Sequence, residues 1–278
     1  MPELPEVETV RRDLDAEFVG RLICEVTAGG VRTLRRHGHP DELVARVRGQ
    51  RLLGAGRRGK YLTLGLGSGD VVVVHLGMSG QLLKADAGAP LVRHTHVVFG
   101  FDGGSELRFV DPRTFGEVFV TAPVQPGGEL RELAHLGVDP LEGIADRDGL
   151  AALLAGRTTR LKPLLMDQTR IAGIGNMYAD EILFAAGLRF DRPALTLGLE
   201  EVDRLHRAMV SVLNAAVAHR GSSFADEQYR DLYGKLGGYQ RLHNVYAREG
   251  LACPGCGAPI ERVKSGGRSN FFCPSCQK

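Results

Sequence analysis

The stretch YLTLGLGSGDVVVVHL (61–76) decides the fold class of this chain. Two runs rich in β-branched and aromatic residues, 61–66 and 71–76, flank the turn sequence GSGD. Such a pattern predicts two short strands. Three further runs of the same kind follow: HVVFGF (96–101), ELRFV (106–110) and GEVFV (116–120). Because these runs do not alternate with helical segments, they favour an antiparallel β-sandwich or barrel over a doubly wound parallel sheet.

Helical patterns lie on both sides of the strand-rich stretch. Before it, apolar residues recur at helical spacing behind Pro5, which predicts a helix over 5–18. After it, the spacing predicts helices over 176–186, with Asn176 as the cap, and over 200–219. The chain is therefore expected to be an α+β multidomain protein.

The boundaries follow from changes in composition. We expect a β-sandwich domain with a flanking helix over 2–125, a linker over 126–150, a helical domain over 151–238 and a cysteine-rich module over 239–278. The length of 278 residues and the 43% apolar content suit about two globular domains. No apolar run approaches a membrane span and the start lacks a signal peptide, so the sequence predicts a soluble intracellular protein.

Four of the five cysteines form the pattern C-x2-C-x16-C-x2-C, with ligands Cys253, Cys256, Cys273 and Cys276. This spacing is typical of a structural zinc site, in which four thiolates complete the metal's shell. Two disulfides are the alternative. From Arg241 onward six Lys/Arg face two Glu, a net charge of +4, so the rest of the chain carries −2. The module is therefore a candidate for polyanion binding. The remaining cysteine, Cys24, is expected to be a small buried apolar residue.

Two loops carry residues that suit nucleic-acid binding. HLGMSG (75–80) holds Met78, and DPRTFG (111–116) holds Arg113 and Phe115. Exposed apolar side chains of this kind can enter a base stack, although core packing of Met78 and Phe115 is equally compatible with the sequence.

The glycine-rich turn before the 176–186 helix resembles a phosphate site. Gly173 and Gly175 precede Asn176, and Lys162 lies upstream. A helix start offers unpaired N–H groups to an anion, and glycines allow its close approach.

Six motifs in order resemble the bacterial formamidopyrimidine-DNA glycosylase family over nearly the whole chain. They are PELPEVETVRR (2–12), RRGKYL (57–62), HLGMSG (75–80), DPRTFG (111–116), GIGNMYADE (173–181) and the four-cysteine module. The resemblance implies a bifunctional DNA glycosylase and AP lyase of base excision repair that excises oxidised purines such as 8-oxoguanine and formamidopyrimidines. It implies an N-terminal β-sandwich, a helix–two-turns–helix domain and a zinc finger holding one structural Zn²⁺.

The resemblance also explains a proline at position 2. In the family the initiator methionine is removed and the proline nitrogen becomes the nucleophile. A terminal amine has an ordinary pKa near 8, so a useful fraction is unprotonated at neutral pH. Its attack on the sugar gives a Schiff base, from which β,δ-elimination follows.

Other roles are implied residue by residue. Pro2, Glu3, Lys60 and Arg268 are the expected catalytic residues: Glu3 is the acid/base for ring opening, Lys60 assists elimination at a phosphate near the lesion, and Arg268 contacts phosphate from the zinc hairpin. Glu6 is expected to shape the first helix. The expected DNA contacts are the void fillers Met78, Arg113 and Phe115, and the phosphate or lesion-proximal residues His94, Lys162 and Asn176.

Two departures from the family pattern concern specificity. Thr114 stands where the family commonly has a second arginine, and the segment 220–240, which in the family caps the flipped purine, differs more. The alternatives are an endonuclease VIII-type glycosylase for oxidised pyrimidines and a non-catalytic zinc protein that binds damaged DNA. In either case the expected partner is double-stranded DNA with damaged bases. The protein is expected to be monomeric, without membrane association, in the bacterial cytoplasm beside the nucleoid.

Overall fold

A computed structural model describes residues 1–125, 127–144, 146–224 and 228–278. Contacts divide the chain into two compact units. The first unit contains Met1–His135 and His219–Gly238, and the second contains Leu136–Ala218 and Tyr239–Lys278.

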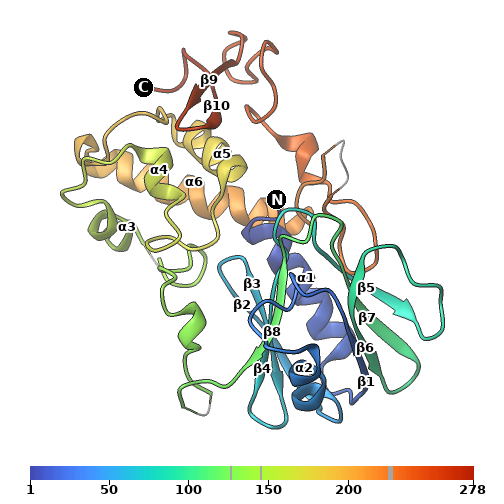
Figure 1. Cartoon of the computed structure of the whole chain (residues 1–278). Coiled ribbons are helices and arrows are strands. Elements are labelled where there is room, and N and C mark those ends of the chain that lie inside the picture. The colour runs from blue at the N-terminus through green and yellow to red at the C-terminus, as the bar shows by residue number, and fades with distance from the viewer. Residues whose placement is uncertain (126, 145, 225–227) are drawn as a thin grey trace. The chain divides into compact units, whose positions relative to one another are not determined.

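Two four-stranded sheets and two helices form the first unit (Figure 1). One sheet has the order β1-β6-β7-β5, made of Ile23–Ala28, Thr95–Phe101, Ser105–Val110 and Gln81–Asp86. The other has the order β2-β3-β4-β8, made of Leu52–Arg58, Tyr61–Leu66, Val71–His75 and Glu117–Thr121. All of their strand pairs are antiparallel. The predicted antiparallel sandwich is confirmed.

The core of this unit explains why leucine alternates with other residues along β3. In β3 every second residue is buried, namely Leu62, Leu64 and Leu66, which is the pattern of a strand with one face on a core. The helix α1 (Leu4–Phe18) buries its apolar stripe in the same core, and α2 (Pro40–Val47) packs on β1 and β8.

The second unit combines helices with a small hairpin. Its helices are α3 (Arg147–Leu154), α4 (Leu161–Leu165), α5 (Asn176–Ala186) and α6 (Leu199–Ala218), and its hairpin pairs β9 (Glu261–Ser265) with β10 (Arg268–Phe272). The 3-10 helices of the two units are Arg131–Leu133, Ala194–Thr196 and Tyr239–Leu242. The expected helices at 176–186 and 200–219 therefore exist almost as predicted. Among the described residues, no helix is long and apolar enough to cross a membrane.

The structure divides the chain differently from the sequence at 219–238. Composition places this segment in the helical domain, yet it belongs to the first unit. Tyr229 and Leu232 enter the sandwich core, and the Lys84 N–H donates to the Leu232 carbonyl at 2.8 Å. A polar, irregular segment gives no sequence signal for such docking. Residues 225–227 of the expected capping segment lie outside the described residues.

Cys24 also differs from expectation. It lies in β1 with an exposed side chain, so it is not the small core residue that the sequence suggested.

Candidate functional site

The four cysteines of the C-terminal module converge on one point. Their Sγ atoms all lie within 4.8 Å of one another, with 3.9 Å between Cys253 and Cys276 and 3.5 Å between Cys256 and Cys273. A disulfide would place sulfur atoms about 2.05 Å apart. A tetrahedral zinc with Zn–S bonds of about 2.3 Å places them about 3.8 Å apart. The residues therefore fit zinc, which would be held by four thiolates with no open position for chemistry.

The zinc hairpin presents Arg268 at its tip. Gly266 and Gly267 both have positive φ and form the two-residue turn between β9 and β10, which is the geometry of a tight hairpin turn. Arg268 follows directly and is exposed. Arg262 is engaged locally, because it donates to the Ser269 hydroxyl and pairs with Glu249.

The amino terminus is packed against the protein. Pro2 and Glu3 are buried, while Met1 is 55% exposed. Glu3 and Glu6 form a reciprocal capping box at the start of α1, in which the Glu3 N–H donates to the Glu6 carboxylate at 2.8 Å. The second Glu6 oxygen accepts from the Ser222 N–H at 2.8 Å. Glu6 thus joins the start of the first helix to the base of the segment 219–238.

Gly221 lies directly against the Glu6 carboxylate. Its φ is +76°, and a Cβ there would lie 2.7 Å from the Glu6 carboxylate oxygen. Only glycine fits this backbone and this distance.

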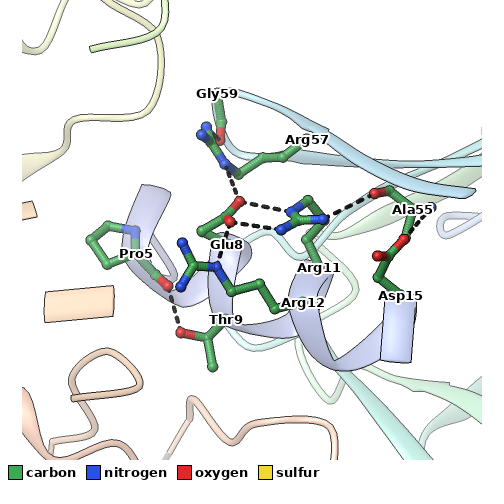
Figure 2. A network of polar contacts seen from close by, with 9 residues as sticks. All are labelled: Pro5, Glu8, Thr9, Arg11, Arg12, Asp15, Ala55, Arg57 and Gly59. Carbon is green, nitrogen blue, oxygen red and sulfur yellow. Dashed lines mark hydrogen bonds and ion pairs between the residues drawn. The ribbon is translucent and has the colours of Figure 1, made fainter. Parts of the chain in front are cut away.

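Glu8 ties the first helix to the β2–β3 hairpin (Figure 2). Its carboxylate, 6% exposed, accepts from Arg11, Arg12 and Arg57 at 2.8–3.0 Å. Burial alone would raise the pKa of Glu8, but the three arginine hydrogen bonds outweigh it and lower this pKa to about 2.

The same network reaches the turn that carries Lys60. Arg57 also donates to the Gly59 carbonyl at 3.3 Å, and its side chain is 1% exposed. Lys60, which follows, is 7% exposed. The sequence does not indicate that Glu8 holds this hairpin, because Arg57 lies 49 residues further along the chain.

Met78 and Phe115 stand on two loops that touch. Met78 is 36% and Phe115 is 44% exposed, so the alternative that they are core residues is wrong. Gly77 has φ +63°, and a Cβ there would lie 2.5 Å from the Gly116 nitrogen, so the two loop backbones are in direct contact. Arg113 is exposed and stacks over the Phe115 ring at 5.0 Å.

Asp111 organises both loops. It is fully buried, accepts from the Ser79 hydroxyl at 2.6 Å and from the Gly116 N–H at 2.7 Å, and its own N–H donates to the His94 carbonyl at 3.0 Å. His94 and Thr114 have left-handed backbones, with φ of 68° and 54°. Such strain in non-glycine residues persists only where the surroundings enforce it.

In the second unit, the glycine-rich turn is fixed by Gln168. Its amide donates to the Ile174 carbonyl at 2.7 Å and accepts from the Gly173 N–H at 2.9 Å. The expected cap differs: Gly175 occupies the N-cap of α5, and Asn176 is the first helical residue. The Asn176 Oδ1 atom is buried and has no hydrogen-bond partner in the described part of the chain.

Lys162 has surroundings unlike those of a surface phosphate contact. It is 2% exposed, pairs with Asp180 at 2.8 Å and donates to the Ser269 carbonyl at 2.9 Å. Its ammonium group is used inside the second unit. A glycine-rich turn nearby in the sequence suggested that Lys162 binds a phosphate. Its actual partners, Asp180 and the Ser269 carbonyl, could not be recognised from the sequence.

Comparison with known proteins decides the family. Models of the formamidopyrimidine-DNA glycosylase N-terminal domain, the H2TH domain and the zinc finger found in FPG and IleRS match residues 1–118, 136–228 and 250–278. The formamidopyrimidine-DNA glycosylase of Desulforamulus reducens is 43% identical over 100% of this chain and 99% of its own.

The chain belongs to the formamidopyrimidine-DNA glycosylase family.

Solved structures agree over the whole length. The MutM (Fpg) protein of Thermus thermophilus has a TM-score of 0.87 and 41% identity, covering 99% of this chain and 98% of that chain. The Lactococcus lactis Fpg, in complex with DNA containing an abasic site, has a TM-score of 0.88 and 33% identity, covering 99% of each chain. The protein is accordingly a DNA glycosylase of base excision repair, a DNA-binding enzyme with a structural zinc finger.

Proposed function

We propose that this glycosylase excises oxidised purines through a Schiff base on Pro2 and then cleaves the strand as an AP lyase. The observation that carries the proposal is the packed amino terminus. Termini are ordinarily frayed, yet Pro2 and Glu3 are buried at the start of α1 while Met1 is exposed. Removal of Met1 would leave a secondary amine on Pro2, next in the chain to the buried Glu3.

Pro2 and Glu3 carry out the covalent step of the proposed reaction. The Pro2 nitrogen attacks C1′ of the sugar, the glycosidic bond breaks, and the base leaves with the bonding electrons and takes up a proton. Glu3 gives a proton to the ring oxygen as the ring opens, which leaves a cationic iminium. Loss of a proton from C2′ then expels the 3′ phosphate, and a second elimination expels the 5′ phosphate. Lys60, on the hairpin held by Glu8, assists these eliminations.

The remaining residues are proposed to bind DNA. Met78, Arg113 and Phe115 fill the gap left by the flipped base, and their exposure on two interlocked loops supports this role. His94, Asn176 and Arg268 contact phosphates. Because Lys162 is enclosed by Asp180 and the Ser269 carbonyl, we propose for it an indirect role in DNA binding.

The partner is double-stranded DNA with a damaged base, bound by one copy of the chain. The Lactococcus lactis relative has been solved with DNA containing N7-benzyl-Fapy-dG, which supports a purine lesion. The same relative has also been solved with DNA containing an oxidised pyrimidine. Pyrimidine lesions are therefore the second candidate substrate.

A direct comparison of lesions tests the substrate. Single-turnover excision would be measured on two otherwise identical duplexes, one with 8-oxoguanine opposite cytosine and one with thymine glycol opposite adenine. We expect faster excision of 8-oxoguanine, with phosphate on both ends of the resulting gap. Faster excision of thymine glycol would show that the enzyme prefers oxidised pyrimidines. Base release without strand cleavage would refute the lyase step.

A further inference from the structure

Adjacent carboxylates in α5 contact the zinc module from two sides. Asp180 is 1% and Glu181 is 0% exposed, so both are removed from solvent in the middle of the helix. Carboxylates are rarely buried unless hydrogen-bonded or paired. The sequence assigned neither residue a role, and the structure gives them backbone partners 63 to 91 residues away.

Glu181 binds the chain where it enters the zinc module. One of its oxygens accepts from the Val245 and Tyr246 N–H groups at 2.9 and 2.8 Å. The other accepts from the Asn244 N–H at 2.8 Å and from the Asn244 side-chain amide at 3.1 Å. Four donors thus converge on a single carboxylate.

Asp180 binds the hairpin itself. It accepts from the Phe271 N–H in β10 at 3.2 Å and pairs with Lys162 at 2.8 Å. Lys162 in turn donates to the carbonyl of Ser269, the neighbour of Arg268. The backbone of β10 is therefore fixed by two charged groups within three residues of Arg268.

The end of the same helix makes a third attachment. Gly187, which ends α5 with φ +69°, accepts from the Lys278 N–H at 3.1 Å, and the Lys278 carbonyl accepts from the Arg189 N–H at 2.9 Å. Phe184 of α5 also packs against the apolar cluster of the module. In Figure 1 the hairpin lies beside α5, in agreement with these contacts.

We propose that Asp180 and Glu181 are positioning residues for DNA binding. They fix the zinc module to the helix that begins at Asn176, so that Asn176 and Arg268 are presented as one rigid pair of phosphate contacts. Lys162 belongs to this anchor, and acts on DNA through the placement of Arg268. The inference rests on the proposed function, because it takes Arg268 and Asn176 as DNA contacts.

Glu181→Gln is the informative variant. An amide of the same shape replaces one oxygen by an NH₂ group, which must then face two N–H donors, so the attachment is weakened without emptying the space. If the anchor acts through Arg268, the negative slope of log K against log salt for binding to abasic-site DNA becomes less steep by about 1, the change also expected for Arg268→Ala. The double variant then binds no more weakly than the weaker single variant. We also expect KM to rise with kcat unchanged.

The controls separate positioning from loss of stability. Asp146 is the N-cap of α3 and lies outside the zinc module; its carboxylate accepts from the Gly149 N–H at 2.9 Å. Asp146→Ala removes this cap. We expect it to destabilise the second unit while leaving the salt dependence unchanged. Zinc content should remain at one per chain in Glu181→Gln. Additive effects of Glu181→Gln and Arg268→Ala on DNA affinity would overturn the proposal.

Hydrogen exchange tests the anchor without DNA. In Glu181→Gln the remaining oxygen faces one pair of donors, so either the Asn244 N–H or the Val245 and Tyr246 N–H groups should exchange faster. The N–H of Phe271 should exchange faster in Asp180→Asn. If Arg268→Ala leaves DNA binding unaltered, the proposed phosphate contact fails, and these exchange rates alone decide about the anchor. Unchanged exchange at Asn244, Val245, Tyr246 and Phe271 would refute it.

Discussion

Replacing Glu8 by glutamine should destabilise the first unit and loosen the hairpin that carries Lys60. The Glu8 carboxylate accepts hydrogen bonds from three arginines, one of which, Arg57, has a side chain that is 1% exposed. Glutamine keeps the size of the side chain but removes the charge. Arg57 would then lose its carboxylate partner at a buried position, which is costly.

The magnitude follows from the pKa of Glu8, which folding lowers from 4.5 to about 2. A change of this size corresponds to about 3 kcal/mol of stability at pH 7. Because the folded-state pKa is depressed, this contribution is present above pH 4.5 and is lost as the pH falls through 2. At pH 3 about 1.4 kcal/mol should remain, by the same relation.

Urea unfolding at pH 7 and pH 3 would be monitored by hydrogen exchange of peptides from β2 and β3. This readout measures the free energy of unfolding of the first unit alone. We expect the wild-type protein to exceed Glu8→Gln by about 3 kcal/mol at pH 7 and by less than half of that at pH 3. Glu25→Gln is the matched control, because Glu25 is exposed on β1, and it should change stability by less than about 0.5 kcal/mol. A Glu8 effect below about 1 kcal/mol at pH 7, or one that is equal at both pH values, would show that the three arginines do not stabilise the ionised carboxylate in this way.

Three other predictions concern chemistry, metal and backbone strain. Pro2→Gly should greatly weaken strand cleavage at 8-oxoguanine, as followed on denaturing gels; undiminished cleavage would remove Pro2 from the mechanism. Metal analysis by mass spectrometry should find one zinc per chain, and chelation should abolish DNA binding in a mobility-shift assay; two disulfides without zinc would contradict the cysteine geometry. Thr114→Asn should raise stability by about 1 kcal/mol in urea unfolding, because asparagine tolerates the left-handed backbone that threonine adopts at φ 54°; a less stable variant would show that this strain is absent.

The elements of the fold were predictable because their signals are local. Alternating leucines marked β3, and apolar spacing behind Pro5 marked α1. The four cysteines were predictable as zinc ligands because tetrahedral thiolate sites recur at fixed spacing. Family motifs then supplied the proposed roles of Pro2 and Glu3, which no periodicity can reveal.

The buried polar groups were not predictable from sequence. Glu8, Asp111 and Asp180 each look like an ordinary surface acid, and each is buried by partners that only the fold brings near. Lys162 illustrates the same difficulty, since its neighbours in sequence suggested a phosphate and its neighbours in space are Asp180 and a carbonyl. The docking of 219–238 on the sandwich depends on Tyr229 and Leu232, two apolar residues in an irregular polar segment.

Borohydride trapping shows whether the Pro2 nitrogen is the nucleophile. The protein would be mixed with a duplex containing 8-oxoguanine opposite cytosine, reduced, and the cross-linked peptide mapped by mass spectrometry, with an abasic-site duplex as the control. We expect a covalent adduct on the nitrogen of Pro2, with Met1 removed, on both duplexes. An adduct at a lysine, or no adduct on either duplex, would contradict it.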